Sequence, residues 1–294
     1  MPNTALFGIL ITCLSYALFS MQDASVKWLV AGLPVWQVLL IRSVTIFALC
    51  LAVGRRPLMY RALHSPVFKP LFIRNVLLLA AWLAFYTAAR DLGLAQLTTL
   101  YYAAPIIMTL LSIPVLGEEV PLNRWVALLI GFAGVVIASN IIGAGLDLSL
   151  PVGLALLAAL FWAIANVLLR KTALSETSLT QMTISNGFFV VFLAPLVPFA
   201  WVPAPWPDLA LMAVTGIIAG AAQFALFEGM RRAPISMLAP FEYTSLIWAF
   251  ILGFLIWGEV PAAHVILGAV LIFSAGLVII ASERMRRPRA AAKI

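Results

Sequence analysis

The chain has 294 residues, of which 64% are hydrophobic and 10% charged, and its mean hydropathy is +1.09. This composition is far too apolar for a soluble domain, so it predicts a membrane protein with only short loops between its spans. The net charge of +7 does not indicate nucleic-acid binding, because the basic residues stand in short runs at the ends of apolar segments, as a topology signal does.

Ten apolar segments follow one another along the chain, separated by Pro, Gly and charged residues. A helix that spans the hydrocarbon core needs about 20 mostly apolar residues. The segments show no alternation of period two, so we expect helices and no barrel strands. The expected spans are residues 5–30, 34–54, 70–90, 95–116, 124–142, 151–170, 178–200, 208–230, 234–257 and 263–281.

The chain contains an internal repeat. Residues 85–118 match residues 226–259 without a gap at an offset of 141, which pairs Arg90 with Arg231, Tyr102 with Tyr243 and Gly117-Glu118 with Gly258-Glu259. The sequence therefore predicts two five-helix repeats, residues 1–145 and residues 146–294, the second ending in a basic cytoplasmic tail. Because five is an odd number, the second repeat is expected to be inverted relative to the first, as in many transporters.

The distribution of Lys and Arg predicts the orientation. If the N-terminus is cytoplasmic, that side holds 15 of the 18 basic residues. We therefore expect a multi-pass protein of a bacterial-type inner membrane with both termini in the cytoplasm. The residues counted on that side are Arg55, Arg56, Arg61, Lys69, Arg74, Arg124, Arg170, Lys171, Arg231, Arg232, Arg284, Arg286, Arg287, Arg289 and Lys293.

Several of these features resemble one family, the ten-helix EamA-type permeases of the drug/metabolite transporter superfamily. The resemblance covers nearly the whole chain. It is carried by the doubled five-helix unit, the Gly-rich fifth helix of each half, and by Gly117-Glu118, Gly258-Glu259, Arg42 and Trp162-Ala163 near Lys171.

The resemblance implies two interleaved, inverted bundles around a central cavity that opens alternately to the two sides of the membrane. The third and fourth helices of each half would line that cavity. At two pairs of equivalent positions, the two halves carry different residues, so their polar side chains are not equivalent. Tyr16 stands where the second half has Trp162, and Asn186 stands in the place of Arg42.

Charged side chains inside the first two spans are candidate functional groups, because such a charge costs about 2.5 to 3.5 kcal/mol on insertion scales. Asp23 and Lys27 are one turn apart and form either a mutual ion pair or a coupling or gating site. Arg42 cannot lose its proton. It either binds a substrate carboxylate, neutralises Asp23, or holds carbonyls at a helix end.

Two acids lie on the eighth and ninth helices. Glu242 follows Pro240 by two residues, and a carboxyl beside loosened backbone suits proton or cation coupling. The alternative for this residue is a buried acid paired with Arg231 or Arg232. Glu228 is a second candidate for coupling or gating. Three further acids end their helices and are expected to cap or pair at loops: Glu118, Glu119 and Glu259.

The repeat places aromatic and polar residues of the third and fourth helices opposite those of the eighth and ninth. Such sets would give flat apolar walls with phenol, amide and carboxyl groups at their edges, which suits a small organic ligand with an apolar body. Packing without a ligand is the alternative. The expected substrate-binding residues are Trp82, Tyr86, Tyr101, Tyr102, Gln223, Phe227, Glu242 and Tyr243, together with Arg42.

These features favour a secondary transporter of small organic metabolites over an intramembrane enzyme or a channel. The sequence has no clustered metal ligands, no paired catalytic acids and no ATP-binding loop, so neither cofactor nor metal is expected. The leading prediction is export of amino acids, aromatic ones included, with protons as a candidate coupling ion. The alternative is uptake of a nucleotide-like, flavin-like or other vitamin metabolite. Arg42 and Lys27 are few cations for a phosphate-bearing ligand, which favours amino acids.

Overall fold

The computed structural model describes residues 3–30, 32–88, 91, 100–138, 149–258 and 263–291, and this part of the chain is helical without strands. Seven of its helices are long and apolar enough to cross a membrane, and three shorter apolar helices accompany them. The prediction of an all-α membrane protein is confirmed. The helices are α1 (Asn3–Leu29), α2 (Val35–Leu63), α3 (Phe68–Ala88), α5 (Ala104–Leu116), α6 (Leu122–Ala138), α7 (Leu150–Ala173), α8 (Ser178–Leu193), α9 (Val197–Ala200), α10 (Trp206–Arg232), α11 (Ile235–Leu238), α12 (Thr244–Trp257) and α13 (Ala263–Ala291).

Several expected spans differ from the helices observed, the second and the ninth among them. The second was expected to end at residue 54, but α2 continues to Leu63 through a kink at Arg55, where φ is 52°. The ninth is broken into α11, a 3₁₀ segment at Ala239–Tyr243 and α12. Pro240 explains this break, because it has no N–H to donate to the helix ladder. The break places Glu242 on irregular backbone, as its distance from Pro240 predicts.

The helix contacts between the halves follow two-fold symmetry. The contact between α1 and α10 has its counterpart in α7 and α3, and that between α1 and α12 in α7 and α5. α2 packs on α8 and α6 packs on α13, and each of these pairs joins helices of equivalent position. The halves are thus interleaved. Because each half crosses the membrane five times, the second half is inverted and the two-fold axis lies in the membrane plane.

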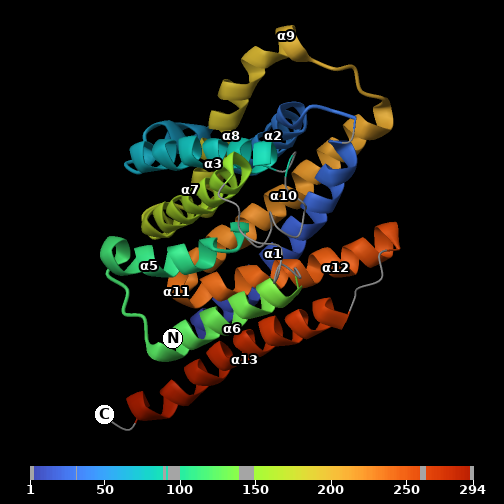
Figure 1. Cartoon of the computed structure of the whole chain (residues 1–294). Helices are drawn as coiled ribbons and strands as arrows, with labels where there is room; N and C mark the ends of the chain where they lie inside the picture. Colours follow the sequence, from blue (N-terminus) through green and yellow to red (C-terminus); the bar gives the residue numbers. More distant parts are fainter. Residues whose placement is uncertain are drawn as a thin grey trace.

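Both ends of the bundle can be followed in Figure 1. The N-terminal end of α1 and the C-terminal end of α13 lie at the same end of the molecule. The boundary expected near residue 145 falls in residues 139–148, and the repeat positions Arg90 and Glu259 also lie outside the described residues. The division into two domains at that boundary stays a prediction.

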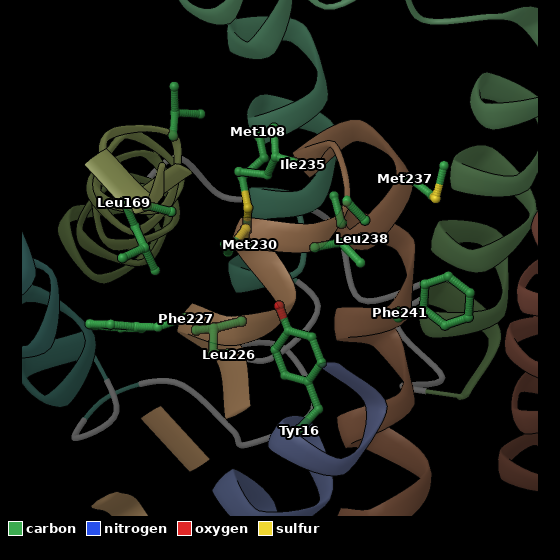
Figure 2. Close-up of a cluster of buried hydrophobic side chains, with 14 of the residues drawn as sticks. Tyr16, Met108, Leu169, Leu226, Phe227, Met230, Ile235, Met237, Leu238 and Phe241 are labelled. Atoms are coloured by element: carbon green, nitrogen blue, oxygen red, sulfur yellow. The ribbon is translucent and has the colours of Figure 1, made fainter. Parts of the chain in front are cut away.

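A buried apolar core lies between α5, α7, α10 and α11. Figure 2 shows the side chains of this core, with the hydroxyl of Tyr16 pointing toward them from α1. Three residues of this core also line a cavity, which is described below, so the core forms one wall of that cavity. They are Tyr16, Leu226 and Phe227. The core includes Met108, Leu169, Met230, Ile235 and Leu238.

Two basic residues counted above on the cytoplasmic side are buried inside the bundle. Arg74 is 5% exposed in α3, and Arg124 is 6% exposed in α6, where its Nη1 donates to the Ser236 hydroxyl at 2.9 Å. Each sits within the first two turns of its helix, so its burial does not test on which side of the membrane it lies. The predicted orientation of the termini stays a prediction.

Candidate functional site

A cavity of about 200 Å³ lies between the two halves, with walls from α1, α2, α3, α7, α8, α10 and the broken segment before α12. Both halves contribute side chains to it, as the symmetry of the helix contacts requires. Most of the residues proposed from the sequence surround this cavity. They are Asp23, Arg42, Trp82, Tyr101, Tyr102, Gln223, Phe227 and Glu242.

Tyr243 was expected to line the cavity and does not. Its side chain is fully buried and packs edge-to-face on the Tyr102 ring, with 5.9 Å between the ring centroids. The space for the ring comes from Gly131 of α6, where an added Cβ would lie 2.5 Å from the Tyr243 ring. Tyr243 therefore joins the broken segment to α6, while its neighbour Glu242 faces the cavity.

Glu228 also lies outside the cavity lining, near the end of α10. Its carboxylate accepts hydrogen bonds from Arg231 at 3.1 Å, from Arg232 and from the Ser178 hydroxyl. The pairing with Arg231 or Arg232 considered for Glu242 is thus made by Glu228. The side chains of Tyr86 and Lys27 lie outside the described residues, so their expected contacts stay predictions.

Aromatic side chains form the walls of the cavity. The Trp82 and Phe189 rings are 5.0 Å apart, and the Phe85 and Tyr101 rings are also 5.0 Å apart. Trp162 lies 6.3 Å from Tyr101 and lines the cavity as well. The sequence analysis did not include Trp162 among the site residues. Its correspondence to Tyr16, which also lines the cavity, was the signal that could have found it.

A polar cluster on α1 and α2 occupies one part of the lining. The Arg42 Nη1 donates to the Gln22 Oε1 at 3.3 Å, and the Gln22 Nε2 donates to the Asp23 Oδ1 at 3.0 Å. The Arg42 guanidinium also lies 4.7 Å from the centroid of the Trp82 ring. Gln22 thus links Arg42 to Asp23 through two hydrogen bonds. This arrangement is similar to the neutralisation of Asp23 that was one of the roles considered for Arg42.

Arg74 is a second guanidinium in the lining, and the sequence analysis missed it as a site residue. Its Nη1 donates to the Ser185 hydroxyl at 3.1 Å and to the Asn75 Oδ1 at 3.3 Å. Its guanidinium also lies 5.2 Å from the Phe227 ring. A charge inside the expected span 70–90 was the available signal. It was overlooked because Arg74 stands near the start of that span.

Glu242 is 3% exposed and lies opposite an indole. The Trp162 Nε1 donates to the Glu242 Oε1 at 2.7 Å. The broken backbone is held by Ser245, whose hydroxyl donates to the Glu242 carbonyl oxygen at 2.6 Å and also meets the Tyr102 hydroxyl at 2.7 Å. The carboxyl is therefore held in position at a residue that lines the cavity.

The unequal polar residues of the two halves occupy equivalent contacts. Arg42 lies on Trp82 in the first half, while the Asn186 Nδ2 donates to the Gln223 Oε1 at 3.0 Å in the second. The repeat offsets pair Arg42 with Asn186 and Trp82 with Gln223. Equivalent residues are therefore in contact in both halves, through a cation on a ring in the first half and through an amide hydrogen bond in the second. The cavity can thus present an asymmetric set of groups to a ligand. In the described residues, no three His, Cys, Asp or Glu side chains are placed to hold a metal ion.

Comparison with known proteins identifies the family. The model of the EamA-like transporter family matches residues 6–140 and 149–281. A solved crystal structure has a TM-score of 0.76 at 18% identity and covers 96% of this chain and 98% of that one, which shows the shared fold.

Two named relatives are transporters. The pseudopaline exporter CntI of Pseudomonas aeruginosa (strain UCBPP-PA14) is 27% identical over 90% of this chain and 93% of its own length. The S-adenosylmethionine uptake transporter of Rickettsia prowazekii is 26% identical over 64% of this chain and 63% of its own. The two family matches cover most of the chain, one in each half. This multi-pass membrane protein, built as two inverted helical repeats around a cavity, therefore belongs to the EamA-like transporter family.

Proposed function

We propose that this small-metabolite transporter exports amino acids, aromatic ones included, by alternating access through the cavity. The observation that carries the proposal is the combination of groups in the lining. Aromatic walls suit an apolar body, while guanidinium and carboxyl groups in the same lining suit a ligand that carries both charges. A free amino acid has this chemistry.

The relatives support the substrate class in general terms. One is named as an exporter and the other as an uptake transporter of S-adenosylmethionine, which is itself an amino acid bearing an adenosyl group. Uptake of a nucleotide-like metabolite is the second candidate. Arg74 favours it, because Arg74 adds a second cation to the cavity beside Arg42, and a phosphate-bearing ligand needs several cations.

Location and coupling belong to the same proposal. The protein would lie in the inner membrane with both termini in the cytoplasm, and protons would be the coupling ion. Glu242 is the candidate proton carrier, because its carboxyl borders the cavity and stands on the broken ninth helix.

Counterflow in proteoliposomes tests the proposal independently of direction. Vesicles preloaded with unlabelled ligand should accumulate radiolabelled phenylalanine or tryptophan, and an imposed pH gradient should change the rate. Protein-free vesicles are the control. Accumulation of nucleosides or vitamins without any amino acid would contradict the proposal and favour the second candidate.

A further inference from the structure

We propose that Arg74 binds the anionic group of the substrate, which for an amino acid is its carboxylate. This inference rests on the proposed function for the identity of the ligand. The site consists of the Arg74 guanidinium, the Ser185 hydroxyl that orients it and the Phe227 ring beside it, and all three residues line the cavity.

Arg74 lacks a counter-charge within the described part of the chain. Arg74 is 95% buried, since only 5% of its surface is exposed, and it has no carboxylate partner among the residues that the structure describes. Its neighbours Ser185, Asn75 and Phe227 are neutral. A buried charge without a partner is costly, so an anion that enters the cavity gains a strong interaction there.

Three other buried charged side chains reach a group of opposite charge. Glu176 accepts from Arg61 at 3.0 Å, and Glu228 pairs with Arg231 and Arg232. Arg42 reaches Asp23 through Gln22. Arg74 differs from all of these, although it lies as deep in the bundle.

The hydrogen bonds of the Arg74 guanidinium use only one of its three nitrogen atoms. Both of its hydrogen bonds use Nη1, while Nε is buried and has no partner in the described part of the chain. Nε and Nη2 form one edge of the guanidinium, and two parallel N–H groups on such an edge match the two oxygens of a carboxylate. The Phe227 ring supports the guanidinium from the side.

The test compares phenylalanine with phenethylamine, which has the same ring and ammonium group but no carboxylate. Purified protein in nanodiscs should bind phenylalanine more tightly than the amine. Arg74→Gln should weaken phenylalanine binding about 10- to 100-fold and leave phenethylamine binding unchanged, because a charge-assisted bidentate pair is lost. Arg74→Lys keeps the positive charge but lacks the two parallel N–H groups, so its affinity for phenylalanine should lie between those of the parent and Arg74→Gln.

Lys69→Gln is the matched control, since Lys69 is an exposed cation on the same helix and should not affect either ligand. The thermal stability of the ligand-free protein gives a second measurement. Removal of an unpaired buried charge should leave the midpoint of Arg74→Gln equal to that of the parent or higher.

Three results would each overturn the role of Arg74. In Arg74→Gln, the affinities for phenylalanine and phenethylamine could fall equally, or phenylalanine binding could stay unchanged. The thermal midpoint of ligand-free Arg74→Gln could also lie below that of the parent. Failure of the parent to bind any amino acid would instead defeat the proposed function. In that case binding of adenosine monophosphate that depends on Arg74 would show an anion site for phosphate.

Discussion

Trp82→Ala should weaken the binding and transport of an aromatic amino acid by roughly 30- to 150-fold, while the protein reaches the membrane in normal amount. The Trp82 ring lies 5.0 Å from Phe189 and 4.7 Å from the Arg42 guanidinium, and it faces the cavity. Loss of ring stacking and of the cation–π contact together corresponds to about 2 to 3 kcal/mol.

The measurement is equilibrium binding of radiolabelled phenylalanine to the purified variant, with membrane abundance determined in parallel. Trp206→Ala is the matched control, because Trp206 is 79% exposed at the start of α10. If Trp82→Ala binds phenylalanine as tightly as Trp206→Ala does, the ring does not contact the substrate.

Glu118→Ala should lower the thermal midpoint by several degrees and reduce transport strongly. The Glu118 carboxylate accepts hydrogen bonds from the backbone N–H groups of Ile235 at 2.9 Å and Ser236 at 3.1 Å, and from the Ser236 hydroxyl at 2.6 Å. The N–H groups at the start of a helix have no partner within it. Loss of these charge-assisted bonds should cost about 2 to 4 kcal/mol.

The effect on transport follows from the position of α11 in the chain. This short helix begins the broken ninth span, and its 3₁₀ continuation carries Glu242 into the cavity lining. Glu119→Ala is the control, because Glu119 is the adjacent acid and is exposed. Equal midpoints for the two variants would show that Glu118 does not anchor the ninth span.

The fold and much of the cavity follow from the sequence for a physical reason. Hydrocarbon leaves a long apolar chain few options besides helices, and the repeat relates positions that meet at the two-fold axis. The Tyr102 and Tyr243 rings, paired by the offset of 141, are in contact in the structure. The offset also places Trp82 and Gln223 in equivalent contacts with Arg42 and Asn186.

The remaining site residues could not be placed from the sequence, because helices apolar on every side do not show which face meets the cavity. Tyr243 and Glu242 are neighbours on the 3₁₀ segment, yet one packs on α6 and the other faces the cavity. The partner of Arg74 is Ser185 on α8, and no repeat offset relates these two residues. Such contacts become visible only when the helices are packed.

Protection of a single cysteine can show whether the cavity between the inverted halves binds the transported amino acid. Ser245 lines the cavity, and the natural cysteines Cys13 and Cys50 can be replaced by serine. Saturating phenylalanine should slow thiol labelling of Ser245→Cys several-fold and leave Ser175→Cys, in an exposed turn, unchanged. Equal labelling rates of Ser245→Cys with and without phenylalanine, in protein that transports it, would show that the amino acid does not bind in this cavity.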